Sequence, residues 1–224
     1  MIKKIIKKIS ALLPVEYFER LSVYSMYKHK FYQTMQIPSF EDRFKLYDFT
    51  LEEYFLNSSM TYIEFGVWKG ESLNYFSTNN LNNESIFIGL DSFEGLPEAW
   101  AGMPQGTFNT NGQLPDINDA RVKFIKGWFQ ETWQQVEPLV YNKIDNPLFV
   151  HFDADLYSST LFALTKMDIF RRSYYAIFDE FFGDETRALY QYLKAYDADV
   201  EFIAKTDYPN GYPRQLLCKI TPNG

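Results

Sequence analysis

The chain has 224 residues, of which 46% are hydrophobic and 23% charged, and it carries a formal net charge of -7. This length fits one globular domain, and the acidic balance argues against a nucleic-acid partner, because phosphate affinity comes from clustered Lys and Arg. The single cysteine, Cys218, cannot form an intramolecular disulfide and is typical of a reducing, cytoplasmic setting.

The first 13 residues, MIKKIIKKISALL, place lysines opposite apolar side chains at helical spacing. The apolar run is too short to span a bilayer, and it lacks the long apolar region and small-residue cleavage site of a signal peptide. We expect an amphipathic helix that packs on a partner chain, as in a homo-oligomer. Peripheral contact of residues 1–13 with an anionic membrane is the alternative.

Residues 14–58 contain Pro14 and Pro38 among many aromatics and alternating charges, without an apolar run of strand length. This pattern predicts helices and loops. We therefore expect residues 1–58 to form a helical extension or cap in front of a main domain at residues 59–224.

From Thr61 the sequence changes to short apolar runs, each followed by a polar or helical stretch. Such alternation is typical of an α/β fold whose mostly parallel sheet is covered by helices on both faces. Strands are expected at residues 61–66, 85–91, 122–127, 148–154, 174–180, 200–205 and 215–220. The last two would complete a seven-stranded sheet as a hairpin around Pro209, Gly211 and Pro213.

Acidic residues recur at one position relative to these strands. Glu64 lies inside the first strand, and five further acids lie at or just after a strand's carboxyl end, namely Asp91, Asp153, Asp155, Asp179 and Glu180. In open parallel sheets the ligand crevice lies outside those ends. We therefore expect these acids to converge on one edge of the sheet.

The sequence EFGVWKGES at residues 64–72 joins the first strand to a helix through Gly66 and Gly70. Glycine lets the backbone approach a ligand closely, and a helix start offers unpaired N–H groups, so this turn can hold the amino-acid end of S-adenosylmethionine. The spacing differs from the dinucleotide fingerprint G-x-G-x-x-G, which disfavours NAD. An ordinary tight turn is the alternative, but Asp91 is placed to accept hydrogen bonds from both hydroxyls of a ribose.

Two later segments are candidates for contacts with substrates. Gly127-Trp128-Phe129 follows the third strand and can bound an adenine ring, although a core or surface position suits Trp128 equally well. The loop at residues 92–120 is rich in Gly, Pro and Asn and is long enough to form a lid. Its large side chains, Phe93, Trp100, Met103 and Phe108, would then contact the acceptor or the cofactor.

Four of the acids form a candidate metal site. Asp153 and Asp155 lie two residues apart at one strand end, and Asp179 and Glu180 follow the next strand. Neighbouring strands are about 4.8 Å apart, so carboxylates from both ends can reach one ion. Mg²⁺ prefers such oxygen ligands, and a cation would relieve the repulsion between the acids.

A family resemblance rests on five segments that occur in order: YIEFGVWKGES (62–72), GLDSFEGLPEAW (89–100), KGWFQETW (126–133), FDADLYSST (152–160) and FDEF (178–181). Between residues 61 and 183 the chain resembles the macrocin and mycinamicin sugar O-methyltransferases and the related enzyme of novobiocin biosynthesis. The resemblance implies a Rossmann-like class I methyltransferase fold. It also implies use of S-adenosylmethionine and Mg²⁺, and methylation of a deoxysugar hydroxyl.

By position, the resemblance assigns Asp153, Asp179 and Glu180 as metal ligands and Asp155 as the general base, with Asp153 also at the catalytic centre. The cofactor site would comprise Glu64, Gly66, Val67, Ser72, Asp91, Ser92, Gly127, Trp128, Phe129 and Asp153. Where the family usually has two aspartates, this chain has Asp179-Glu180, and glutamate is also a competent oxygen ligand.

Several alternatives stay open at this point. Histidine is the side chain that ordinarily titrates near neutrality, so His151 is a second candidate base, but its place inside a strand puts it below the crevice. The acceptor is expected to be a small molecule or a glycan, and a catechol or other small phenol would suit the same metal geometry. A scaffold that keeps the fold without turnover is the alternative from another class.

Overall fold

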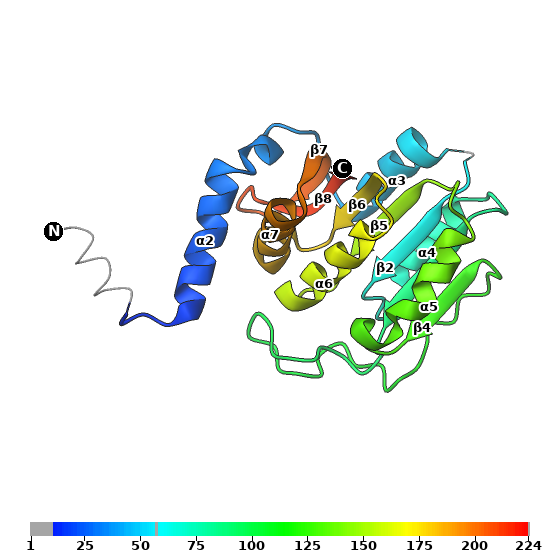
Figure 1. Cartoon of the computed structure of the whole chain (residues 1–224), viewed down its shortest axis with the longest axis horizontal. Helices are drawn as coiled ribbons and strands as arrows, with labels where there is room; N and C mark the ends of the chain where they lie inside the picture. The colour runs from blue at the N-terminus through cyan, green and yellow to red at the C-terminus, as the bar shows by residue number, and fades with distance from the viewer. Residues whose placement is uncertain (1–10, 57, 224) are drawn as a thin grey trace.

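The structure is a computed structural model that describes residues 11–56 and 58–223 (Figure 1). Its helices are α2 (Val15–His29), α3 (Arg43–Thr50), α4 (Glu71–Asn79), α5 (Phe129–Tyr141), α6 (Tyr157–Asp168) and α7 (Thr186–Tyr196), with short helical segments η1 (Tyr32–Met35), η2 (Leu51–Phe55) and η3 (Phe181–Glu185). Its strands are β1 (Ser39–Phe40), β2 (Thr61–Phe65), β3 (Ile86–Asp91), β4 (Val122–Lys126), β5 (Leu148–Phe152), β6 (Tyr174–Phe178), β7 (Ala198–Asp207) and β8 (Pro213–Pro222). The helix expected at residues 1–13 lies almost wholly outside the described residues.

All strands belong to one eight-stranded sheet with the order β1-β7-β8-β6-β5-β2-β3-β4. β8 pairs antiparallel with both of its neighbours, and the other pairs are parallel. The α/β class and the mostly parallel sheet are confirmed. Because β2 lies between β5 and β3, the chain reverses its direction of travel across the sheet at β2, and the carboxyl ends there frame the ligand crevice of such folds.

The expectation of seven strands, with none in residues 14–58, was wrong. Ser39 and Phe40 form β1, which pairs in parallel with Lys205 and Thr206 of β7, and the Lys205 N–H donates to the Pro38 carbonyl at 3.0 Å. Two residues are too few to produce an alternating pattern. The strand exists because the edge of β7 offers it hydrogen-bond partners.

Side chains of the central strands alternate between two hydrophobic cores, one on each face of the sheet. Ile63 and Phe65 pack with residues of α5, α6 and α7, whereas Tyr62 packs with residues of α3, η2 and α4. The β5 side chains alternate in the same way, with Phe149 on the Tyr62 face. Residues 62, 64, 151 and 153 therefore face the same side of the sheet.

The segment before β2 contributes to that second core. Leu46 and Tyr47 of α3 and Phe55 of η2 are at most 1% exposed and pack among side chains of β2, β5 and α4. Burial of each such side chain stabilises the fold by about 1.5–3 kcal/mol. Residues 43–55 thus cover one face of the sheet, and a domain boundary at residue 58 stays a prediction.

Helix α2 lies along α7 and η3 at one side of the molecule (Figure 1). Tyr27 packs edge-to-face on Phe182 and Tyr212, and Glu19 pairs with Arg187 at 2.8 Å. Among residues 11–56 and 58–223, no helix is long and apolar enough to cross a membrane.

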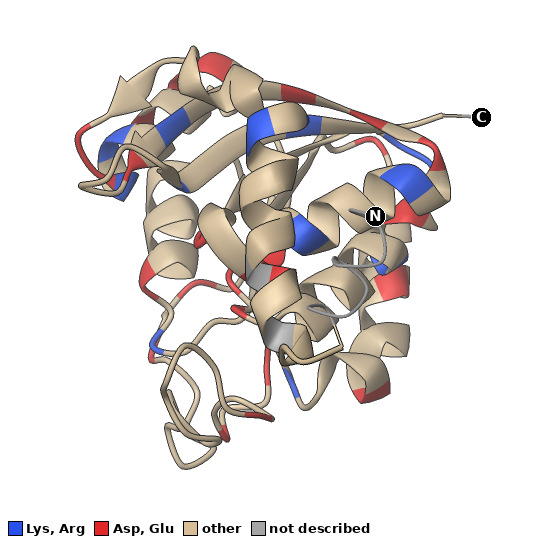
Figure 2. Ribbon diagram, turned by 90° about the vertical axis from the view of Figure 1, so that its left-hand side faces the viewer, with Lys and Arg blue, Asp and Glu red and all other residues tan. Residues whose placement is uncertain are grey.

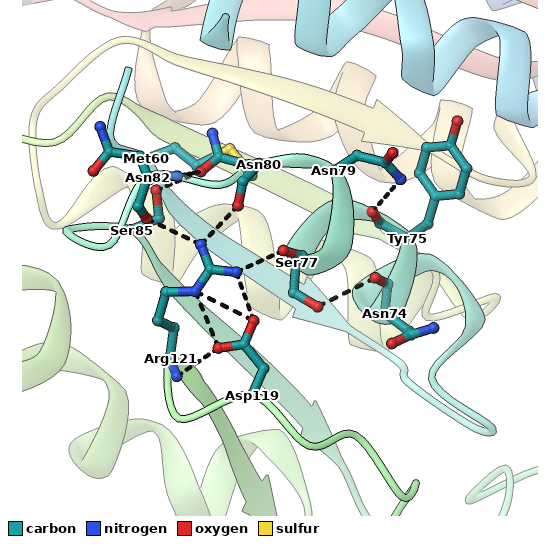
Figure 3. A network of polar contacts seen from close by, with 10 residues as sticks. All are labelled: Met60, Asn74, Tyr75, Ser77, Asn79, Asn80, Asn82, Ser85, Asp119 and Arg121. Atoms are coloured by element: carbon teal, nitrogen blue, oxygen red, sulfur yellow. Dashed lines mark hydrogen bonds and ion pairs between the residues drawn. The ribbon is translucent and has the colours of Figure 1, made fainter. Parts of the chain in front are cut away.

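Arg121, just before β4, ties the end of α4 to the sheet (Figure 3). Its guanidinium donates to the carbonyls of Ser77 and Asn80 at 2.6 Å and of Asn82 at 3.0 Å, and it pairs with Asp119 at 2.6 Å. The last carbonyls of a helix have no partner within the helix, so a buried end needs such a donor. One side chain satisfies three carbonyls and a carboxylate.

Replacing Arg121 with Ala is expected to lower the free energy of unfolding by about 3 kcal/mol, because charged hydrogen bonds are lost and buried acceptors stay unsatisfied. Urea denaturation measures the change. Hydrogen bonding to Arg121 lowers the pKa of Asp119. The stability that this pair contributes is therefore fully present above the ordinary pKa of an aspartate and is lost as the pH falls through the lowered pKa. The difference in unfolding free energy between Arg121→Ala and the unaltered protein should become smaller at acidic pH.

Lys123 provides the control for this prediction. It lies on β4, is exposed, and on replacement by Ala should change stability by less than about 0.5 kcal/mol. Equal denaturation midpoints for the two variants would show that Arg121 has no such role.

Candidate active site

A cavity of about 700 Å³ opens at the carboxyl ends of the central strands. Its walls come from the turn after β2, the loop after β3, the start of α5 and the segments after β5 and β6, with Arg43 and Arg214 added from more distant parts of the chain. Asp and Glu positions recur along the loops in the lower half of Figure 2. A cavity of this size accommodates a cofactor or a drug-sized ligand.

Gly66 brings the turn after β2 into direct contact with the end of β5. Its φ is +91°, and a Cβ at this position would lie 1.9 Å from the carbonyl oxygen of Asp153. The Asp153 N–H also donates to the Phe65 carbonyl at 2.9 Å. No residue with a side chain fits here unless the backbone moves, so the glycine turn and the acidic strand end share one wall.

Asp91, the last residue of β3, holds the same turn in place. One carboxylate oxygen accepts hydrogen bonds from the N–H groups of Val67 and Trp68, both at 2.8 Å, and the other accepts from Phe93 N–H at 2.6 Å. The side chain still lines the cavity. Asp91 therefore has a structural role in the turn, and its contact with a ribose stays a prediction.

The residues assigned from the sequence fall into two groups. Those that line the cavity are Gly66, Asp91, Ser92, Trp128, Phe129, Asp153, Asp155, Asp179 and Glu180. Four others, Glu64, Val67, Ser72 and Gly127, do not belong to its lining. Ser72, for example, is buried beside the Tyr47 hydroxyl at 3.2 Å. The structure thus brings the acids of neighbouring strand ends together, as the strand pattern indicates.

The loop at residues 92–120 forms part of the cavity wall. Trp100 and Phe108 line the cavity, whereas Phe93 is fully buried in the core and Met103 is outside the lining. Phe108 packs edge-to-face on Trp68, with ring centroids 5.5 Å apart. Both residues have positive φ angles, +69° and +48°, and such strained backbone in bulky residues is often found at functional sites.

Three side chains at the bottom of the site could share one metal ion. His151, Asp153 and Asp179 each offer a ligand atom, and these atoms lie within 4.8 Å of one another. Phe152 pairs with Phe178, so Asp153 and Asp179 extend β5 and β6 at the same level and on the same side. Glu180 faces the cavity outside this trio, and its carboxylate lies 3.6 Å from Arg214.

The crowded acids have shifted pKa values. Burial raises the pKa of Asp153 well above its ordinary value, and the nearby carboxylates of Asp179 and Asp155 raise it further. Burial opposes ionisation of Asp179 too, but the proximity of His151 and Arg43 holds its pKa below the ordinary value. Two acids that share a small volume favour one charge between them, and a cation would stabilise both carboxylates in the ionised form.

Asp155 also has a shifted pKa. Burial, followed by the charges of Glu180 and Asp179, raises its pKa to about 7. Its φ of +57° lies in the left-handed region, which Asp tolerates better than most residues. A carboxylate with such a pKa can accept a proton near neutral pH.

Three further residues of the site were not assigned from the sequence. Arg43 of α3 and Arg214 of β8 line the cavity, although no local pattern marks them, because they approach only through the packing of distant segments. Glu185 is buried at the end of η3 and accepts a hydrogen bond from Glu180 N–H at 3.1 Å. His151 is fully buried and outside the cavity lining, as its position within a strand indicates.

The sheet order and the cavity at the carboxyl ends of the central strands define a Rossmann-like α/β protein with a ligand crevice. Comparison with known proteins identifies the family: the chain belongs to the macrocin-O-methyltransferase (TylF) family, whose model matches residues 58–208. The resemblance noted from the sequence is thereby confirmed.

Individual relatives agree with this assignment. The demethyldecarbamoylnovobiocin O-methyltransferase of Streptomyces niveus is 25% identical over 127 residues, which cover 47% of this chain and 46% of that protein. The match thus spans less than half of that relative. An O-methyltransferase from Bacillus cereus, solved with S-adenosylhomocysteine, superposes with a TM-score of 0.51 at 14% identity and covers 99% of this chain and 100% of its own. At that identity the likeness shows the fold.

Proposed function

We propose that this protein transfers the methyl group of S-adenosylmethionine to a hydroxyl oxygen of a sugar, with a divalent cation as a second cofactor. The proposal rests on one observation: the glycine turn and the acidic strand ends line the same cavity, in van der Waals contact at Gly66 and Asp153. Donor and acceptor sites must adjoin for methyl transfer, because the hydroxyl oxygen has to approach the methyl group in line with the sulfur.

In this proposal the cofactor lies between the glycine turn and the start of α5. The turn at Gly66 would receive its amino-acid end, Asp91 and Ser92 would face the ribose, and Trp128 would lie beside the adenine. Glu64 lies within β2, before this turn, where burial raises its pKa to about 7 against the lowering effects of His151 and Tyr62.

Asp155 is the residue that would accept the proton. S-adenosylmethionine would supply the methyl group when bound, and the Asp155 carboxylate would take up the hydroxyl proton that the transfer releases. A pKa near 7 is suited to that transfer, and general-base assistance typically contributes about 10²- to 10⁴-fold in rate.

Asp153 and Asp179 would hold the cation, because they present carboxylate oxygens beside a buried histidine nitrogen. Glu180 is a further candidate ligand from the other side of the cavity. The resemblance to the family suggests Mg²⁺. A bound cation would supply Lewis-acid polarisation of the acceptor oxygens.

An acceptor screen with radiolabelled S-adenosylmethionine tests the proposed function. Deoxysugar glycosides with vicinal hydroxyls should be labelled, and labelling should stop when EDTA removes the cation and resume when Mg²⁺ is added back. Labelling of catechols alone would instead identify a phenol O-methyltransferase. Binding of S-adenosylhomocysteine without labelling of any acceptor would favour a non-catalytic scaffold.

Arg43 gives a sharper prediction about the orientation of the cofactor. It lines the cavity and its guanidinium contacts Glu71, the first residue of α4, so it can pair with the cofactor's carboxylate at the end of the glycine turn. Arg43→Ala should weaken S-adenosylhomocysteine binding about 10- to 100-fold, because the loss of a hydrogen bond to a charged group changes affinity by about that factor. Calorimetry measures this loss.

A truncated ligand and a neighbouring residue serve as controls. 5′-Methylthioadenosine lacks the carboxylate and should bind Arg43→Ala and the unaltered protein equally well. Lys45→Ala, on the same helix with 62% of its side chain exposed, should leave both affinities unchanged. Equal weakening of both ligands by Arg43→Ala would contradict a contact with the carboxylate.

A further inference from the structure

His151 is a buried polar side chain whose two ring nitrogens have different surroundings. Nδ1 lies 3.1 Å from the Tyr62 hydroxyl. Nε2, in contrast, has no hydrogen-bond partner among the residues that the structure describes, and the whole side chain is 0% exposed. An unsatisfied buried nitrogen costs roughly 1–3 kcal/mol, so a partner is to be expected.

The contacts of Nδ1 determine which nitrogen carries the proton. The Tyr62 hydroxyl donates to the Glu64 carboxylate at 2.6 Å, and a hydroxyl has only one proton to donate. When Glu64 is ionised, the hydrogen bond between Tyr62 and His151 therefore uses the Nδ1 proton. In the neutral ring this leaves a lone pair on Nε2.

That lone pair faces the acidic strand ends. Asp179 Oδ1 lies 3.7 Å from Nε2, and Asp153 also places an oxygen within 4.8 Å. A separation of 3.7 Å is too long for a hydrogen bond. It does suit two ligands of one ion, because metal–ligand bonds of about 2.1 Å put neighbouring ligands about 3 Å apart and opposite ligands about 4 Å apart.

We propose that His151 binds the divalent cation through Nε2, together with Asp153 and Asp179, and that the site prefers a first-row transition-metal ion to Mg²⁺. This inference rests on the proposed function only in taking the cation to be a cofactor of methyl transfer. The binding itself can be measured without methyl transfer.

The surroundings of the trio match those of known metal centres. A metal-binding histidine usually donates its second N–H to an oxygen acceptor, which fixes the tautomer and the ring orientation, and Tyr62 with Glu64 forms such a support. Asp179 is oriented in the same way, because Gln215 Nε2 donates to its side-chain oxygen at 3.2 Å and to its carbonyl at 3.1 Å.

The ligand types decide the preferred ion. Mg²⁺ favours oxygen ligands only and is usually held by carboxylates, water and substrate. Imidazole nitrogen suits later first-row ions, and affinities for mixed nitrogen and oxygen sites rise from Mn²⁺ to Cu²⁺ and fall again at Zn²⁺. One imidazole among two carboxylates should therefore bind Mn²⁺ at least about 10-fold more tightly than Mg²⁺.

Mn²⁺ is the probe for the experiment, because its unpaired electrons report directly coordinated nitrogen. Tag-free protein is loaded with Mn²⁺ without S-adenosylmethionine, and electron spin echo envelope modulation is recorded. We expect ¹⁴N modulation in the unaltered protein and in His29→Gln, and none in His151→Gln. The chain has two histidines, and His29 is exposed on α2, so these variants separate the possible sources of the signal.

Titration gives the second measurement. His151→Gln should weaken Mn²⁺ binding about 10- to 100-fold or more, and Tyr62→Phe should weaken it about 10-fold with the ¹⁴N signal retained. If His151→Gln fails to fold, a signal that survives in His29→Gln still assigns the nitrogen to His151.

Two results would overturn the inference. Mn²⁺ bound without ¹⁴N modulation would mean a site made of carboxylates, with His151 acting as a charged partner of Asp179, and the proposed methyl transfer would stand. Absence of Mn²⁺ binding at millimolar concentrations would remove the site altogether. The acceptor screen with EDTA then decides separately whether the proposed function survives without a metal.

Discussion

Replacing Asp155 with Asn should reduce kcat by about 10²- to 10⁴-fold and leave S-adenosylhomocysteine binding unchanged. The amide keeps the size and shape of the side chain but cannot accept the hydroxyl proton. Asp155 lies just after β5, where burial and the charges of Glu180 and Asp179 raise its pKa to about 7. Initial rates at saturating donor measure kcat, and calorimetry measures the affinity.

The same substitution at an exposed aspartate serves as the control. Asp145→Asn introduces the same chemical change at an exposed position before β5 and should have no effect on rate. If Asp155→Asn keeps full turnover, Asp155 is not the base. If it loses donor binding together with turnover, its role is structural.

Replacing Gly66 with Ala should abolish donor binding and destabilise the fold. The new Cβ would lie 1.9 Å from the carbonyl oxygen of Asp153, so the ends of β2 and β5 must separate. Overpacking costs about 1–3 kcal/mol, and the left-handed φ adds about 1–2 kcal/mol. A displacement of about 1 Å at a catalytic site can reduce the rate about 10²-fold.

Gly211→Ala is the control that separates the cost of the left-handed backbone from the cost of the steric clash. Its φ is +82°, but a Cβ there would meet nothing within 4 Å. Gly211→Ala should therefore cost only the backbone term, about 1–2 kcal/mol, with donor binding intact. Urea denaturation and calorimetric titration with S-adenosylhomocysteine measure both variants. Equal losses of stability and normal binding in Gly66→Ala would contradict the close contact as the basis of the site.

The chemistry proposed for the site depends on charge that the fold concentrates at one point. Asp153, Asp155 and Glu180 all have raised pKa values because they are buried near one another. Repulsion of this kind costs stability unless a ligand offsets it. A sulfonium cofactor and a divalent cation both carry positive charge, so either would relieve it. The same charge would disfavour an anionic acceptor.

The segment before β2 has a larger role than its sequence suggests. Residues 43–55 cover one face of the sheet, Arg43 lines the cavity and β1 extends the sheet. The division into a cap at residues 1–58 and a main domain stays a prediction. The expected homo-oligomer and the contacts of residues 1–13 stay predictions.

The sequence alone determined the features that depend on local pattern. Short apolar runs separated by polar or helical stretches predicted seven of the strands, because a strand buried on both faces must be apolar on both faces. The acids that follow those strands predicted the edge of the sheet at which the cavity opens. Gly66 indicated the turn after the first strand, because glycine lets the backbone approach a ligand closely. The hydrogen bonds by which Asp91 holds this turn were not predicted. The ordered motifs then indicated the family, which the comparison confirmed.

Only the tertiary structure decided the relations between distant segments. It paired β1 with β7, brought Arg43 and Arg214 to the cavity, and turned Glu180 towards Arg214. It also left His151 Nε2 without a hydrogen-bond partner among residues 11–56 and 58–223, within 4.8 Å of ligand atoms of Asp153 and Asp179. Such contacts join residues far apart in the chain, and their geometry follows from how helices and strands pack, which no local pattern of residues records.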